Sequence, residues 1–156
     1  MLAETLIYSK LTANLSLLTY IGGTPANTKI SPGVAPEHIA PPYITYNTIS
    51  NVPTNSKGVL SATNDINSNV EVQRVQVSCF GTQYDQVITM SLAVKKQLQN
   101  LQNTSITTSY SIVGSRTIGF ETCIFESEQD DYEKKAGAQG IFSRHLDFIV
   151  RTVNIT

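Results

Sequence analysis

The feature that most constrains the fold is a change of hydrophobic period at Gly81. Before Gly81, the run VEVQRVQVSCFG (residues 70–81) places apolar side chains at alternate positions, which is typical of a β-strand. After it, residues 82–101 repeat apolar side chains every three or four positions, which is typical of an amphipathic helix. Thr82 and Asp85 form a plausible capping pair for this helix. We therefore expect a strand that leads straight into a helix whose apolar stripe packs on the sheet.

The alternation within residues 70–81 changes phase. Val70 and Val72 fall on one face of the strand, whereas Val75, Val77 and Cys79 fall on the other. This predicts either a β-bulge near Gln73 or Arg74 or a strand buried on both sides.

The first half of the chain predicts a helix, a connector and a strand. Apolar side chains recur at helical spacing in the first twenty residues, Asn14 is a candidate cap for a second short turn, and Gly22 and Gly23 end the pattern. A proline-rich connector follows and has room for a short strand at residues 29–31. Pro41 and Pro42 then restrict the backbone to extended conformations, so a strand is expected from Tyr43.

The second half of the chain reads as strands in residues 105–114, 115–127 and 140–153. We expect Ile118 to Ile124 to present alternate residues on one face of the middle strand. The last strand places Phe142, Leu146, Phe148 and Val150 on a single face, with Arg144 the exception. The order helix, strands, helix, strands predicts one α+β domain over residues 1–156. Its mainly antiparallel sheet would carry the N-terminal helix and the long amphipathic helix on one face.

Two polar segments are expected to lie outside the sheet. A long loop at about 51–69 is rich in Asn, Ser and Thr, and a charged hairpin tip is expected at about 126–139. Their length and polarity suggest contacts with partner proteins. The candidate interface residues are Asn55, Lys57, Asn64, Asp65, Asp130, Asp131, Lys134 and Lys135.

Composition removes several classes of function. The 11 Lys and Arg residues nearly balance the 12 Asp and Glu residues, so little cationic surplus is left for tight nucleic-acid binding. No segment approaches the roughly 20 apolar residues of a membrane span, and the N-terminus lacks the features of a signal peptide. Cys79 and Cys123 lack metal-ligand spacing, and we expect no disulfide between them. These features predict a soluble protein made in the cytosol.

The remaining chemical possibilities are a hydrolase and a calcium-binding domain. Ser143, His145 and Asp147 share a face of the last strand and form the residue set of a hydrolase triad, but neighbours at i and i+2 point in parallel instead of converging. The acidic run at residues 126–133 lacks the ligand pattern of an EF-hand. We therefore assign no catalytic, cofactor-binding or metal-binding residue. A monomeric ligand-binding or calcium-binding domain, or a hydrolase that uses this face, stays as the alternative.

The order of these segments resembles that of the tail completion or tail terminator proteins of long-tailed bacteriophages. The resemblance rests on PPYITY (residues 41–46) after a short helix, on RVQVSCFG (residues 74–81) leading into the long helix, on the acidic DYE (residues 131–133), and on residues 144–150 of the closing strand. It spans most of the chain.

The resemblance implies a structural protein and no enzyme or cofactor. Proteins of that family form a ring, usually six-fold, that caps the tail tube, stops its growth and joins the tail to the head. The implied partners are further copies of the chain in a hexamer, the tail-tube protein and a head-connector or head-completion protein, with no membrane. Genomic DNA would pass the channel without specific binding. The implied location is the tail or neck of the virion, after synthesis in the cytoplasm of the host bacterium.

Overall fold

The computed structural model describes residues 2–53, 70–99, 101, 104–110, 114–134 and 136–154. The candidate loop residues Asn55, Lys57, Asn64, Asp65 and Lys135 lie outside these ranges. The elements are α1 (Leu2–Thr12), α2 (Leu15–Tyr20), β1 (Ile30–Pro32), β2 (Tyr43–Pro53), β3 (Val70–Gly81), α3 (Tyr84–Leu98), β4 (Thr104–Tyr110), β5 (Gly114–Glu133) and β6 (Ile141–Asn154).

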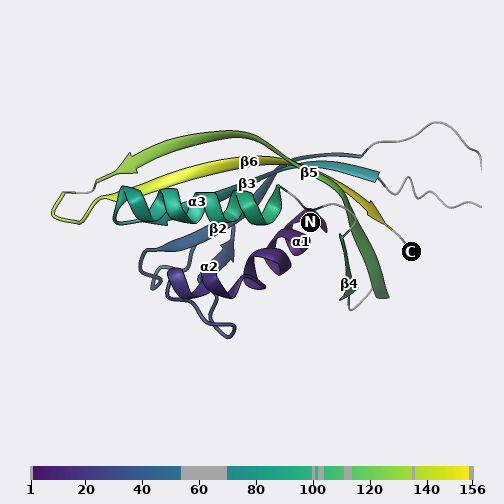
Figure 1. Cartoon of the computed structure of the whole chain (residues 1–156), viewed down its shortest axis with the longest axis horizontal. Coiled ribbons are helices and arrows are strands. Elements are labelled where there is room, and N and C mark those ends of the chain that lie inside the picture. Colours follow the sequence, from purple (N-terminus) through teal and green to yellow (C-terminus); the bar gives the residue numbers. More distant parts are fainter. Residues whose placement is uncertain are drawn as a thin grey trace, which may run out of the picture.

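The strands form one six-stranded sheet in the order β1-β2-β3-β6-β5-β4. Every neighbouring pair is antiparallel except β1 and β2, which are parallel. Within the described ranges, the three helices all lie on one face of this sheet, and the other face carries no helix (Figure 1). The predicted α+β class is therefore confirmed.

The core lies between the helices and the strands β3 and β6. Residues 75, 77 and 79 of β3 and residues 146, 148 and 150 of β6 point toward the helices and are fully buried. They pack with Val87, Met90, Val94 and Leu98 of α3 and with Leu6, Ile7 and Leu11 of α1. The alternation read from the sequence predicts the buried faces of β3 and β6 correctly. The apolar stripe expected for α3 is correct in part, because Tyr84 and Leu92 belong to that stripe but are exposed, whereas Met90 lies outside it and is buried.

Local signals at the ends of α1 and α2 also agree with the structure. The Asn14 side chain accepts a hydrogen bond from the Leu17 amide at 3.1 Å and caps α2, as predicted. Gly22 has φ +71°, a conformation that glycine adopts without strain, and the Gly23 amide donates to the Leu18 carbonyl at 2.8 Å.

The predicted start of α3 is wrong. The N-cap is Gln83, whose extended backbone carries no side-chain cap hydrogen bond. Thr82 does not form a capping pair with Asp85; its hydroxyl instead contacts the Gln86 side chain at 3.4 Å.

The predicted bulge near Gln73 or Arg74 is also wrong. β3 keeps one continuous register with β6, and the irregularity lies in the facing strand β2, between Thr48 and Ser50. The change of phase in β3 arises because Gln73 occupies a fully buried position, where its side-chain oxygen accepts a hydrogen bond from the Ala3 amide at 3.0 Å. This buried polar residue interrupts the alternation of apolar residues in the sequence, but the strand itself is continuous.

The connection between β5 and β6 is shorter than the predicted tip at 126–139. β5 stays paired with β6 as far as Glu133, opposite Ile141, so residues 126–133 lie in the strand. Cross-strand partners explain the difference, because Asp130 lies opposite Arg144 and Tyr132 opposite Phe142. Register shifts in β5 between Phe120 and Thr122, and between Phe125 and Ser127, also interrupt the single face expected for Ile118 to Ile124.

The first two strands of the sheet lie close to the positions predicted from the sequence. β1 corresponds to the short strand expected at residues 29–31, and β2 begins at Tyr43, directly after Pro41 and Pro42, whose shared peptide bond is cis. β2 continues to Pro53, so the predicted polar loop does not begin at 51. Among the described residues, no helix is long and apolar enough to cross a membrane.

Candidate functional site

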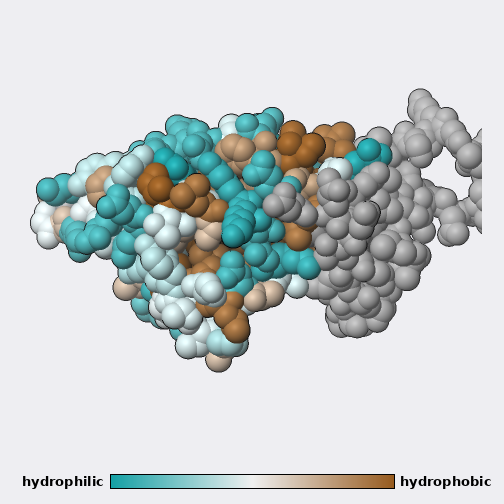
Figure 2. Space-filling view, viewed as in Figure 1, coloured by the Kyte–Doolittle hydropathy of each residue, from teal (hydrophilic) through white to brown (hydrophobic). Residues whose placement is uncertain are grey.

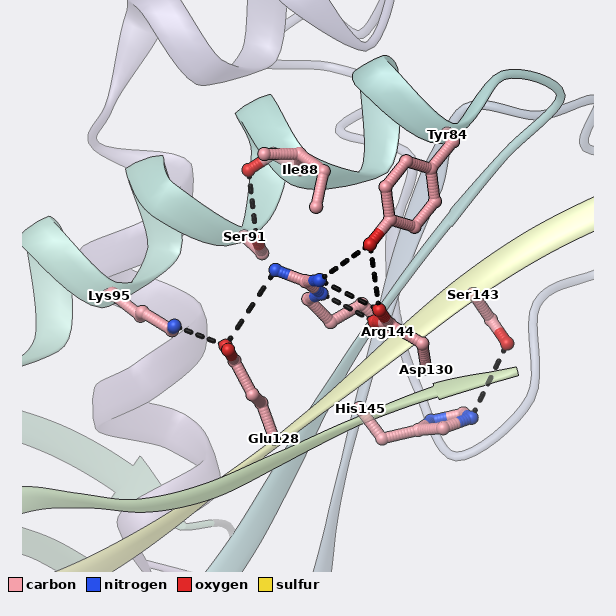
Figure 3. A network of polar contacts seen from close by, with 9 residues as sticks. All are labelled: Tyr84, Ile88, Ser91, Lys95, Glu128, Asp130, Ser143, Arg144 and His145. Carbon is pink, nitrogen blue, oxygen red and sulfur yellow. Dashed lines mark hydrogen bonds and ion pairs between the residues drawn. The ribbon is translucent and has the colours of Figure 1, made fainter. Parts of the chain in front are cut away.

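Arg144 is the centre of a polar network that joins β6, β5 and the start of α3 (Figure 3). Its guanidinium forms two bonds with Asp130, Nε to Oδ1 at 2.5 Å and Nη2 to Oδ2 at 2.8 Å. The Tyr84 hydroxyl donates to Asp130 Oδ2 at 3.0 Å and accepts from Arg144 Nη2 at 3.2 Å. The network thus ties the outer part of the β5–β6 hairpin to α3.

Glu128 extends this network along α3. It forms an ion pair with Lys95, and Arg144 Nη1 lies 3.8 Å from its Oε2. The Lys95 ammonium also lies 4.5 Å from the centre of the Phe125 ring, a cation–π distance.

The electrostatics of the network favour the ionised state of both partners. The hydrogen bond from Arg144, and then that from Tyr84, hold the pKa of Asp130 below its ordinary value despite partial burial. The same hydrogen bond to Asp130 raises the pKa of Arg144. A bidentate, charge-assisted pair of this kind fixes the relative position of two strands more firmly than a single contact would.

The sequence contains a signal for this network. Arg144 is the one charged side chain on the face of β6 that carries Phe142, Leu146, Phe148 and Val150, and it lies opposite Cys79 and Asp130. Tyr84, Lys95 and Glu128 give no comparable signal, because their proximity depends on how α3 crosses β5. Of the three predicted interface residues that the structure describes, Asp130 belongs to the network, and Asp131 and Lys134 do not.

The other described interface candidates lie near the end of the hairpin. Asp131 lies in β5 on the face without helices, and its carboxylate accepts a hydrogen bond from the Tyr132 amide at 2.7 Å. Lys134 lies in the connection to β6 and is exposed. Asp131 and Lys134 make no ion pair among the described residues.

The set Ser143, His145 and Asp147 lies on the face of the sheet that carries no helix. His145 Nδ1 lies 2.7 Å from the Ser78 hydroxyl, and Nε2 lies 3.4 Å from the Ser143 hydroxyl. Ser78 comes from the neighbouring strand and was not predicted; its register partner in β6 is His145.

Asp147 does not join this group. Its carboxylate instead accepts hydrogen bonds from Arg74 at 2.8 Å, Gln76 at 3.0 Å and Ser127 at 3.3 Å. The arrangement therefore lacks the contact between carboxylate and imidazole that orients the base in a hydrolase triad.

The acidic residues of β5 do not converge on a point where a cation could bind. Glu128 and Asp130 face the helices, whereas Asp131 and Glu133 face the opposite side, because successive strand residues alternate. Over the ranges that the structure describes, no three His, Cys, Asp or Glu residues are placed to hold a metal ion.

A shallow groove lies on the helical face between the α1–α2 junction and α3. It has a volume of about 590 Å³ and is lined by Leu15, Ser16, Ala93 and Lys96 among others. A second hollow of about 450 Å³ continues along α2 to Tyr20. Hydrophobic side chains, coloured brown in Figure 2, interrupt the hydrophilic surface on this side of the molecule.

Comparison with known proteins gives a fold likeness. No protein-family model and no curated protein matches the chain. Among solved structures, the chain is similar to a chain in the structure described as "Virion of native gene transfer agent (GTA) particle", with a TM-score of 0.57 and 16% sequence identity. The similarity covers 95% of this chain and 91% of that chain. At 16% sequence identity, the similarity shows a shared fold.

Proposed function

We propose that the protein is a structural subunit of a bacteriophage or phage-like particle. It assembles as a ring, in the hexameric form typical of tail terminators, on the end of the tail tube. There it ends tube polymerisation and joins the tail to the head connector. On this proposal, the protein acts through shaped and charged surfaces, and it makes or breaks no covalent bond.

The observation that carries the proposal is the fold shared with a chain of a virion-like particle over nearly the full length of both chains. This likeness is independent of the segment order PPYITY, RVQVSCFG and DYE, from which the resemblance to tail terminators arises. Two separate kinds of comparison thus lead to a particle subunit. The proposed position at the end of the tail tube rests on the resemblance in segment order.

The surfaces of the chain suit a subunit of a ring. A ring requires head-to-tail contacts between unlike surfaces, and this molecule has a sheet face without helices, a hairpin held to α3 by Arg144 and a groove beside α2. The partners on this proposal are further copies of the chain, the tail-tube protein and the head-connector or head-completion protein. Genomic DNA would cross the ring without sequence-specific contacts.

The proposal is tested by adding the purified protein to tail-tube protein as it polymerises, with tube lengths measured by electron microscopy. A capping subunit shortens the tubes in proportion to its concentration and appears at tube ends. An equal concentration of an unrelated protein of similar charge is the control. Tubes of unchanged length, with no added density at their ends, would refute the capping role.

A further inference from the structure

The outward side of α3 carries a row of exposed residues along its whole length. They are Asp85, Thr89, Leu92, Lys96 and the C-cap Gln99, which follow one another at intervals of three or four positions. At 3.6 residues per turn, all five lie within about 80° of one another around the helix axis, opposite the buried side chains that pack on the sheet. We call these five residues the outer row.

The middle of the outer row is apolar. Leu92 is 57% exposed, and Ile88, one turn before it, is half-buried. Because side chains four positions apart are neighbours on a helix, Ile88 and Leu92 form one continuous apolar surface. This surface packs against nothing in the core of its own molecule at Leu92, so it is free to contact another protein.

The two ends of the outer row carry opposite charges. Asp85 lies in the first turn of α3 and Lys96 in the last turn, and neither forms an ion pair within the part of the chain that the structure describes. Lys95, by contrast, points toward β5 and is paired with Glu128 (Figure 3). The helix dipole favours an acid at the start and a base at the end, but it does not require both to lie on the side of Leu92.

The order acid, apolar, base is complementary to the same order in reverse. If two α3 helices pack antiparallel with Asp85 of each copy beside Lys96 of the other, two ion pairs form. The same arrangement sets Leu92 beside Thr89 of the other copy, because Thr89 follows Asp85 by four residues and Leu92 precedes Lys96 by four. The two Leu92 side chains are then only about 4.5 Å apart along the helices. A parallel arrangement would instead place like charges together.

We propose that two copies of this chain associate through their outer rows, antiparallel about a two-fold axis. Such a contact is self-complementary and closes after two copies. Only one helix from each copy takes part, so the surface is small and the dimer is transient. The inference goes beyond the proposed function, because a ring is built from unlike surfaces, whereas this contact joins like surfaces.

Cysteine cross-linking at a single position tests the contact even though the association is transient. Thr89→Cys places one thiol near the two-fold axis, about 4.5 Å along the helices from its copy, and leaves both charges and Leu92 intact. Both native thiols are buried, and burial raises the pKa of Cys79 and of Cys123 to about 12, so neither competes at neutral pH. The variant is treated with a short bismaleimide, and the cross-linked dimer is separated by mass.

Gln99→Cys is the matched control. Gln99 is exposed in the same row, but it lies beyond Lys96, so its two copies are about 25 Å apart along the helices in the antiparallel pair. Because the contact raises the effective concentration of one thiol near its copy only at position 89, roughly tenfold more dimer is expected from Thr89→Cys than from Gln99→Cys. Equal yields, as random collision or parallel packing would give, would overturn the proposal.

Reversing the charges tests the ion pairs. In the Thr89→Cys chain, Lys96→Glu sets an acid beside each Asp85, so the dimer yield is expected to fall roughly fivefold at low salt. Adding Asp85→Lys to the same chain restores both pairs in reversed order and should restore the yield. Lys134→Glu is the control, since it makes the same charge change at an exposed position outside α3.

Two results of the charge reversal would contradict the contact. One is an equal loss of dimer with Lys96→Glu and Lys134→Glu, and the other is no recovery in the chain with exchanged charges. The exchanged charges oppose the helix dipole, so circular dichroism first confirms that each variant is folded. The comparison of Thr89→Cys with Gln99→Cys needs neither charge change and decides the proposal by itself.

The tube-length assay separates this inference from the proposed function. If the protein shortens tubes while Thr89→Cys gives no excess of dimer, the two-fold contact fails and the capping function stands. If the dimer forms as predicted while tubes grow to their usual length, the contact stands and the capping function fails.

Discussion

Arg144 and Asp130 face each other on neighbouring strands and form two parallel bonds, at 2.5 Å and 2.8 Å, on the side of the sheet that carries α3. The Arg144 side chain is only 11% exposed, whereas that of Asp130 is 40% exposed. The pair is therefore intermediate between a surface ion pair and a buried ion pair. Removing the Arg144 charge leaves the Asp130 carboxylate without its partner at a partly covered site.

Replacing Arg144 tests how far this pair fixes the hairpin. Arg144→Met is expected to lower the free energy of unfolding by about 1–2 kcal/mol, because Asp130 loses both bonds at a partly covered site. Arg74→Met is the matched control, since Arg74 pairs with Glu126 and Asp147 but is 42% exposed, and a loss of about 0.5 kcal/mol is expected. Urea unfolding of the three proteins measures both values. Equal losses of unfolding free energy in the two variants would show that the burial of Arg144 adds nothing to the stability that its ion pair provides.

The Asp130 carboxylate predicts a pH dependence on the acid side. Its pKa in the folded protein is depressed below the ordinary value of 3.8, chiefly by Arg144, so its contribution to stability is fully present above that value and is lost as the pH falls through the folded pKa. The difference in unfolding free energy between the wild type and Asp130→Asn should be larger at about pH 7 than at about pH 2. Chemical unfolding at the two pH values measures it, and a difference that does not change with pH would contradict the pairing.

Gln73 is predicted to stabilise the start of α1 from the core. It is fully buried, and it accepts the hydrogen bond that the Ala3 amide would otherwise lack. Gln73→Met keeps the size of the side chain but leaves that amide unpaired, so a loss of about 1–3 kcal/mol is expected. Gln76→Met, on the face without helices, is the control and should cost less. A neutral Gln73→Met variant would show that the amide finds another partner.

Leu6 and Leu15 should differ in how much each contributes to stability. Leu6 is fully buried beneath the sheet, and Leu6→Ala is expected to cost about 2–5 kcal/mol. Leu15 is 64% exposed, so Leu15→Ala should change stability by no more than about 0.5 kcal/mol. Thermal unfolding of the two variants measures both values, and equal losses of stability would contradict the difference in burial between Leu6 and Leu15.

Much of the fold follows from hydrophobic period alone. The stripe of α3 and the alternation of β6 each point to one buried face, and Val94 and Phe148 lie where those patterns place them. The signals at Asn14 and Gly22 depend only on local backbone geometry, so they too could be read from the sequence.

Two of the errors occur where a distant residue decides the local structure. Gln73 looked like a break in β3 because its partner, Ala3, is 70 positions away in the chain. The acids of residues 126–133 looked like a loop because their partners, Arg144 and Lys95, come from other elements. A local pattern carries no information on such contacts. For this reason, the faces of the sheet and the exceptional position of Arg144 were predictable, whereas the partners of Arg144 were not.

The central claim is that the chain occupies one end of a tail tube. Labelling of isolated phage particles with an antibody to this protein, viewed by electron microscopy, tests it most directly. The account predicts label at a single position on each particle, where the tail meets the head. Label distributed along the tube, or particles without label, would contradict it.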